Sequence, residues 1–192
     1  MNQADEKWRL FVALELPEQL LPELTEWQRE IVERAPEELR AVRPQALHVT
    51  LAFLGDRTPE QAEAAGAALA AMAGLAAPRL SFLPEPVGRP ERRPRLYAAE
   101  LAADPALTEL RAAVVTALEH AEVFRDEPRP FWPHVTLCRV RGRVRHHAPT
   151  DPPRSAASLA EPAVASRCTL FRSVLGPSGP RYEELASVEL SD

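Results

Sequence analysis

The tetrapeptide His-Val-Thr-Leu occurs twice in this chain, at His48 to Leu51 and again at His134 to Leu137. In a β-strand, alternate side chains point to the same face of the sheet. The His and Thr of each copy would therefore share one face, while the Val and Leu would face a hydrophobic core. The chain holds only five histidines, so coincidence is a poor explanation of the repeat. We expect two equivalent strands, one in each half of the chain.

The length and composition fit one globular domain. The chain has 192 residues, of which 45% are hydrophobic and 27% charged, values that argue against intrinsic disorder. The formal net charge is -5, so any contact with nucleic acid has to be local. Cys138 and Cys168 have the spacing of neither a disulfide framework nor a zinc ribbon, which favours a reducing cytosol. Neither a signal-peptide layout nor a membrane-spanning run is present, so we expect a soluble, cytoplasmic protein.

The hydrophobic pattern predicts an α+β protein with strands and helices along the whole chain. Strands are expected at 8–16, 39–42, 47–54, 79–82, 96–101, 134–140, 168–175 and 182–190. Apolar residues spaced by three and four positions predict a helix after Pro17 and another after Asp104. Between them, Thr58 to Gln61 resembles a capping box and predicts a helix to about Gly74. The segment 84–94, rich in Pro and Arg, is expected to be a loop.

The residue types in the repeat suit displacement at phosphorus. If the two halves are duplicated lobes, a pseudo-twofold axis would bring His48, Thr50, His134 and Thr136 together across a cleft. One neutral imidazole could then accept a proton from the nucleophile while one protonated imidazole gives a proton to the leaving oxygen. The threonine hydroxyls could donate to the non-bridging oxygens. This chemistry requires no metal and no cofactor. The alternative is that both histidines are hydrogen-bonded core residues in repeated strands.

At these residues the chain resembles the two-histidine (2H) phosphoesterase superfamily. In particular it resembles the bacterial RNA 2',3'-cyclic phosphodiesterase group, which is LigT-like and also named RNA 2'-5' ligases. The resemblance covers nearly the whole chain. It rests on Arg9 to Leu14, on Leu47 to Gly55, on Pro133 to Arg139, on Leu170 to Ser173, and on Gly179 and Tyr182. Arg43 departs from the family pattern, because many relatives have an aromatic residue before the segment that corresponds to Leu47 to Gly55.

The resemblance implies one domain over residues 1–192, made of two interleaved lobes that each contribute one His-x-Thr strand. The two lobes would hold pseudo-symmetric antiparallel sheets with flanking helices around a central cleft. The implied reaction is hydrolysis of a terminal 2',3'-cyclic phosphate to a 2'-phosphate, with His48 as proton donor and His134 as proton acceptor. Thr50, Thr136 and Arg139 match phosphate-contacting or basic positions. The implied partners are RNA with 2',3'-cyclic phosphate ends or cyclic nucleotides, bound by a monomer without a cofactor.

The position of Arg139 conflicts with strict alternation. Counting from His134 along a regular strand places Arg139 on the face opposite His134 and Thr136. A role in phosphate binding therefore requires a twist or a β-bulge in this strand.

Three alternatives remain open at this point. Cys138 shares the expected face with His134, so His48, His134 and Cys138 could form a zinc site, although residues four apart on a strand lie some 13 Å apart. The chain could also be a non-catalytic module that binds RNA ends. Finally, the same two histidines could join a cyclic phosphate end to a 5'-hydroxyl, the reverse reaction.

Further arginines and aromatic residues could contact RNA. One series comprises Arg139, Arg141, Arg143 and Arg145 with His146 and His147, and another comprises Arg89, Arg92, Arg93 and Arg95. The simpler interpretation is solvated loop charge. Phe53 and Trp132 could stack on a base, although aromatic residues beside strands more often belong to the core.

Overall fold

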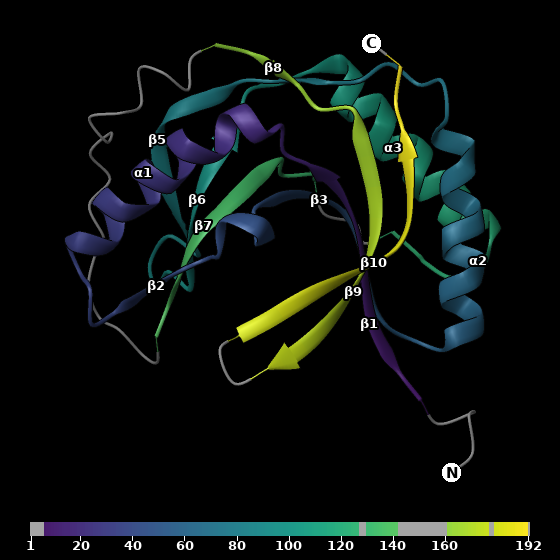
Figure 1. The fold of residues 1–192 in the computed structure, drawn as a ribbon, viewed down its shortest axis with the longest axis horizontal. Coiled ribbons are helices and arrows are strands. Elements are labelled where there is room, and N and C mark those ends of the chain that lie inside the picture. Colours follow the sequence, from purple (N-terminus) through teal and green to yellow (C-terminus); the bar gives the residue numbers. More distant parts are fainter. Residues whose placement is uncertain (1–5, 127–129, 142–160, 177–178, 192) are drawn as a thin grey trace.

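The computed structural model describes residues 6–126, 130–141, 161–176 and 179–191. Within these ranges the chain forms ten strands and three α-helices (Figure 1). The helices are α1 (Leu21–Glu33), α2 (Pro59–Leu69) and α3 (Pro105–His120). The strands are β1 (Trp8–Glu15), β2 (Leu39–Ala41), β3 (His48–Arg57), β4 (Arg79–Leu80), β5 (Phe82–Arg89), β6 (Leu96–Leu101), β7 (His134–Val140), β8 (Ala163–Val164), β9 (Arg167–Gly176) and β10 (Gly179–Glu189). The α+β class expected from the sequence is confirmed.

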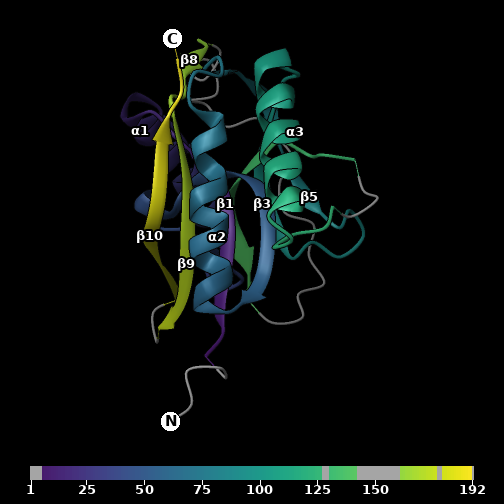
Figure 2. The same cartoon turned by 90° about the vertical axis from the view of Figure 1, so that its right-hand side faces the viewer.

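Eight strands form one antiparallel sheet in the order β10-β9-β1-β3-β7-β6-β5, with β2 also paired to β7. Only one residue pair, Val49 with Val135, joins β3 to β7. The sheet therefore divides there into two halves. Helix α2 packs against β10, β9 and β1 and α3 against β3, whereas α1 packs against β2 and β7. Figure 1 shows these two groups on opposite sides of the molecule, and Figure 2 shows α2 lying over the strands of its half.

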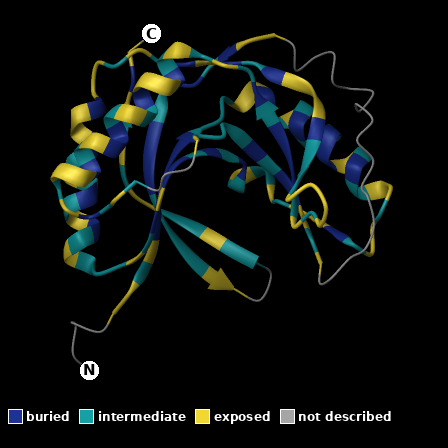
Figure 3. Ribbon diagram, turned by 180° about the vertical axis from the view of Figure 1, so that it is seen from behind, coloured by how far each residue is buried: buried dark blue, intermediate teal, exposed yellow. Residues whose placement is uncertain are grey.

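Buried apolar residues lie along the strands and on the inner sides of the helices (Figure 3). In α1 the buried residues are Leu24, Trp27, Gln28 and Ile31, which follow the three- and four-residue spacing seen in the sequence. Helix α2 begins as expected, because Thr58 and Gln61 form both hydrogen bonds of a capping box. It ends at Leu69 and continues as a 3-10 turn to Met72, close to the expected end at Gly74.

The segment 84–94 is partly a strand, which corrects the expectation of a loop. Strand β5 continues through Pro84 and Pro86 to Arg89, and pairs with β6. Proline cannot donate a backbone hydrogen bond, so it is tolerated in a strand mainly at the edge of a sheet. Since β5 is the last strand in the order, it pairs on one side only and accommodates both prolines.

A β-bulge interrupts both copies of the repeated motif at the same place. In the β1–β3 ladder, Val12 pairs with Ala52 but Ala13 pairs with Thr50, so Leu51 is the extra residue. In the β6–β7 ladder, Tyr97 pairs with Cys138 but Ala98 pairs with Thr136, so Leu137 is the extra residue. A bulge of this kind reverses the alternation of faces beyond it. The third residue after each threonine is consequently exposed: Phe53 in β3 and Arg139 in β7.

Gln28 fixes α1 to the strand that carries the second motif. Its side chain is buried, with 4% of its surface exposed, and its Nε2 donates to the carbonyls of Val42, at 2.8 Å, and Leu137. A buried carbonyl that loses its donor carries the full cost of its desolvation. Gln28 therefore satisfies backbone groups at the bulge of β7.

We expect Gln28→Ala to lower the free energy of unfolding by about 1–3 kcal/mol, because it removes buried atoms and takes this donor from the Val42 carbonyl. The Leu137 carbonyl keeps its bond from the Val42 N–H, at 2.9 Å. Urea denaturation followed by circular dichroism measures the change. Arg29→Ala is the matched control, since Arg29 is an exposed neighbour whose ion pairs with Glu26 and Glu33 are screened by solvent and contribute little to stability. Equal loss in both variants would contradict the role of Gln28.

Candidate active site

The two copies of the motif meet on neighbouring strands. Because β3 and β7 are antiparallel and Val49 pairs with Val135, the next positions place His48 across from Thr136 and Thr50 across from His134. A cavity of about 410 Å³ opens at this junction. Its lining includes His48, Thr50, Thr136 and Arg139, together with Arg9, Phe11, Val42, Ala46, Phe53, Ser173, Leu175, Pro180 and Tyr182. The structure thus brings together the predicted site residues, with His134 beside the cavity at Thr50.

Both imidazoles are held by the same local hydrogen bond. Nδ1 of His48 lies 2.8 Å from the carbonyl of Ala46, and Nδ1 of His134 lies 2.8 Å from the carbonyl of Trp132. A carbonyl only accepts, so each Nδ1 carries a proton and donates it. This leaves Nε2 of each ring to exchange protons with another group. In His48, Nε2 lies 3.1 Å from the hydroxyl oxygen of Thr50.

The surroundings of His48 disfavour its charged form. Its ring stacks on Phe11, with centroids 4.9 Å apart, and meets the edge of Tyr182 at 5.4 Å. Burial lowers the pKa of His48 to about 4, and the nearby charges of His134 and Arg139 act in the same direction.

The surroundings of His134 include a carboxylate. Burial also lowers the pKa of His134, but the charge of Glu100, which pairs with His134 across β6 and β7, opposes this effect. Glu100 Oε1 accepts a hydrogen bond from Trp132 Nε1, and the Trp132 ring stacks on His134 with centroids 3.7 Å apart. Arg89 reaches Glu100 at 3.4 Å and lies over the Trp132 ring. Glu100 therefore acts on His134 both through its charge and through Trp132.

Sequence reasoning missed Glu100, and it left Trp132 open as a base-stacking residue. The available signal was a single acidic residue inside the apolar run Leu96 to Leu101. Phe53 is 56% exposed, with the Arg9 guanidinium 5.8 Å from its ring centroid, so it is a surface residue at the cavity and lies outside the core.

Comparison with known proteins identifies the family of this fold. The profile described as LigT like Phosphoesterase matches residues 14–90. An RNA 2',3'-cyclic phosphodiesterase of Thermus thermophilus is 35% identical over 192 residues, which cover 95% of this chain and 90% of the relative. The chain belongs to the LigT-like phosphoesterase family. A Bacillus subtilis protein of the same name is 31% identical over 78% of this chain and 80% of its own length.

Solved structures of LigT-like proteins have the same fold. A crystal structure of a Thermus thermophilus protein superposes with a TM-score of 0.78 and 28% identity, covering 94% of this chain and 97% of the other. Escherichia coli LigT complexed with 3'-AMP superposes with a TM-score of 0.74, covering 97% of this chain and 100% of the other. At 24% identity the second likeness shows the fold alone.

The bulge in β7 determines where Arg139 and Cys138 lie relative to this LigT-like site. Arg139 lines the same cavity as Thr136, so the irregularity that its predicted role requires is present. Cys138 is correspondingly turned into the core, with 0% of its surface exposed, and burial raises the pKa of its thiol to about 12. The expectation that Cys138 shares a face with His134 is therefore wrong. Among the described residues, no three His, Cys, Asp or Glu side chains are grouped as metal ligands.

The predicted arginine series is only partly within the described residues. Arg139 and Arg141 are described, whereas Arg143, Arg145, His146 and His147 lie outside the described ranges. In the other series Arg92, Arg93 and Arg95 are exposed near the β5–β6 connection. Across the described part of the chain, no helix has both the length and the apolar character needed to cross a bilayer.

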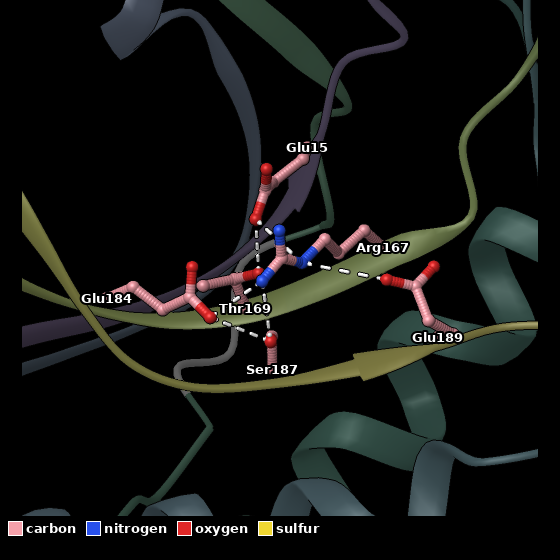
Figure 4. Close-up of polar contacts among 6 residues, drawn as sticks. All are labelled: Glu15, Arg167, Thr169, Glu184, Ser187 and Glu189. Atoms are coloured by element: carbon pink, nitrogen blue, oxygen red, sulfur yellow. Dashed lines mark hydrogen bonds and ion pairs between the residues drawn. The ribbon is translucent and has the colours of Figure 1, made fainter.

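A polar cluster continues this face of the sheet beyond His48, onto β1, β9 and β10 (Figure 4). Glu15 pairs with His48 in the ladder, and its carboxylate accepts from Thr169 and lies 3.5 Å from Arg167 Nε. Arg167 also reaches Glu184 at 2.7 Å and Glu189 at 3.7 Å. Three carboxylates thus surround this one guanidinium, so its charge contributes little to the field of the cavity.

We expect Glu100→Gln to lower the pKa of His134 further. Glutamine keeps an oxygen that accepts from Trp132 Nε1 but removes the negative charge that favours the imidazolium. Titration of the imidazole Cε1 proton by NMR measures the change. Glu91→Gln is the control, because Glu91 also pairs with Arg89, at 2.6 Å, but is exposed. An unchanged or raised pKa of His134 in Glu100→Gln would show that the carboxylate does not stabilise its charged form.

Proposed function

We propose that this chain hydrolyses RNA 2',3'-cyclic phosphate ends to 2'-phosphates by general acid–base catalysis between His48 and His134. The observation that carries the proposal is that His48, Thr50 and Thr136 line one cavity while His134 lies opposite Thr50 beside it. Each imidazole also donates its Nδ1 proton to a backbone carbonyl. The family relatives named RNA 2',3'-cyclic phosphodiesterases support the choice of substrate. The expected partners are RNA ends of this kind or cyclic nucleotides.

In the proposed reaction the water oxygen forms a bond to phosphorus as the bond to O3' breaks. Nε2 of His134 accepts the proton of the water, and Nε2 of His48 donates a proton to O3'. The asymmetry of the surroundings supports these roles. A group with a lowered pKa is a stronger donor once protonated, which suits His48. The Glu100 carboxylate stabilises the imidazolium that forms on His134.

Thr50, Thr136 and Arg139 are proposed to bind the phosphate. All three line the cavity, and the register places Thr50 opposite His134 and Thr136 opposite His48. Hydroxyl and guanidinium donors aimed at the non-bridging oxygens stabilise the charge that shifts onto them in the transition state. These donors and the two histidines supply every proton transfer and charge contact of the step, so we propose that it proceeds without a metal ion or other cofactor.

We also propose a domain organisation, an oligomeric state and a cellular location for this chain. We treat residues 1–192 as one domain of two interleaved lobes, because β2 from the first half pairs with β7 and β9 from the second half pairs with β1. A monomer in the cytoplasm is proposed as well. Both Cys138 and Cys168 are unpaired and buried, as in proteins of a reducing compartment.

The decisive experiment incubates the purified protein with 2',3'-cyclic nucleotides and cyclic-ended RNA in EDTA. We expect formation of a 2'-phosphate, identified by NMR, and a large loss of turnover in His48→Ala and His134→Ala. Arg79→Gln, a change at an exposed position on β4, should retain activity in the same buffer. Activity that chelation abolishes and zinc restores would overturn the metal-independent mechanism. Binding of the RNA end without turnover would overturn the enzymatic function and indicate a module that only binds RNA ends. Incubation with a 5'-hydroxyl RNA tests the reverse, 2'-5' ligation.

The pH dependence of kcat/KM should be bell-shaped, with its maximum between about pH 4 and 6.5. The active form of the free enzyme has His48 charged and His134 neutral, which is one of the two ways in which the pair holds a single proton. The pKa of His48 is lowered to about 4 and that of His134 is lowered from 6.5, so above this range both are neutral and the acid is lost. Below it both are charged and the base is lost. Bound phosphate raises both pKa values, so kcat should peak at higher pH. A rate that rises steadily through pH 9 would contradict the mechanism.

A further inference from the structure

A second, smaller cavity of about 230 Å³ adjoins the catalytic cavity. Three arginines line it, Arg40, Arg43 and Arg139, together with Ala41, Val42, Ala46, Gly179, Pro180 and Tyr182. Five of these residues also line the catalytic cavity: Val42, Ala46, Arg139, Pro180 and Tyr182. The two spaces therefore share a wall, and Arg139 stands between them.

The charges of this smaller cavity are of one sign. Arg40 pairs with Arg139 across β2 and β7, so two guanidinium side chains start from directly opposite positions. Like charges at opposite positions of an antiparallel pair are destabilising. Among the described residues that line the cavity none carries a carboxylate, and neither Arg40 nor Arg139 has a carboxylate ion pair in the part of the chain that the structure describes. The contrast with Arg167, which lies among three glutamates, is clear (Figure 4).

The β9–β10 hairpin holds one of these arginines in place. Gly179 has φ +110°, and a Cβ at this position would lie 3.2 Å from Arg40 Nη2. The absence of a side chain at Gly179 therefore allows the Arg40 guanidinium to lie against the hairpin backbone. This contact links β2 to the hairpin that carries Pro180 and Tyr182, which also line the cavity.

We propose that this cavity binds a second phosphate group of the substrate, the 5'-phosphate of the nucleotide whose 2',3'-cyclic phosphate lies between the histidines. Arg139 lines both cavities, so we assign its guanidinium to both phosphates, whereas Arg40 lines the smaller cavity alone and contacts only the second phosphate. Guanidinium groups suit phosphate oxygens, and an anion here turns the repulsion of the two arginines into charge-assisted contacts. The proposal rests on the proposed function and narrows its substrate to nucleotides that carry a phosphate at the 5' position. RNA ends meet this requirement, whereas unphosphorylated nucleoside 2',3'-cyclic phosphates do not.

Hydrolysis of adenosine 2',3'-cyclic phosphate with and without a 5'-phosphate tests this proposal. For the wild type, we expect kcat/KM to be about tenfold or more higher with the 5'-phosphate, the effect of one charge-assisted contact. Arg40→Gln should remove this advantage and leave kcat/KM for the unphosphorylated compound unchanged. Arg79→Gln, which changes an exposed arginine that is not among the lining residues, is the matched control and should keep the advantage.

Calorimetric binding of the two products separates this proposal from the proposed function. Adenosine 2',5'-bisphosphate should bind the wild type about tenfold or more tightly than adenosine 2'-phosphate, and Arg40→Gln should bind both alike. Turnover without any gain from the 5'-phosphate would overturn the second phosphate site and leave the proposed function standing. A gain in binding that depends on Arg40, without turnover of either compound, would support the site and overturn the proposed function.

Discussion

The single pairing of Val49 with Val135 is the contact on which the arrangement of the site depends. Both valines are fully buried, and on either side of them β3 and β7 diverge to other partners. One residue pair in an antiparallel ladder fixes the register of its neighbours, so His48 meets Thr136 and Thr50 meets His134. A shift of either strand by one residue would turn its own His and Thr into the core and bring its valine to the cavity. The hydrophobic burial of the valines therefore protects the alignment of the polar groups.

The two halves of the site are similar in backbone and different in electrostatics. Each imidazole is oriented by the carbonyl two residues before it, and each motif ends in a bulge after its threonine. His48 lies against Phe11 and Tyr182, whereas His134 lies against Trp132 and near Glu100. The duplicated backbone supplies the geometry of a symmetric site, and the packing residues make one histidine the stronger acid.

The repeated tetrapeptide made the meeting of its two copies predictable, because alternation within a strand determines which side chains share a face. It could not reveal the bulges at Leu51 and Leu137, which depend on how each strand pairs with its neighbour. For this reason the sequence left the face of Arg139 uncertain, and the predicted face of Cys138 was wrong. The strand through Pro84 and Pro86 was missed for a similar reason, since only the sheet order shows that β5 is an edge. Glu100 was visible as an acid in an apolar strand, but its partner Trp132 lies 32 positions away along the chain.

The local origin of the histidine hydrogen bonds has a mechanical consequence. Ala46 orients His48 and Trp132 orients His134, and each of these carbonyls belongs to the segment that leads into the strand of its own histidine. The alignment of each imidazole is thus set within a segment of three residues. A small hinge displacement between the two halves of the sheet would change the spacing of the imidazoles, but the tautomer of each ring and the nitrogen left for proton transfer would stay the same.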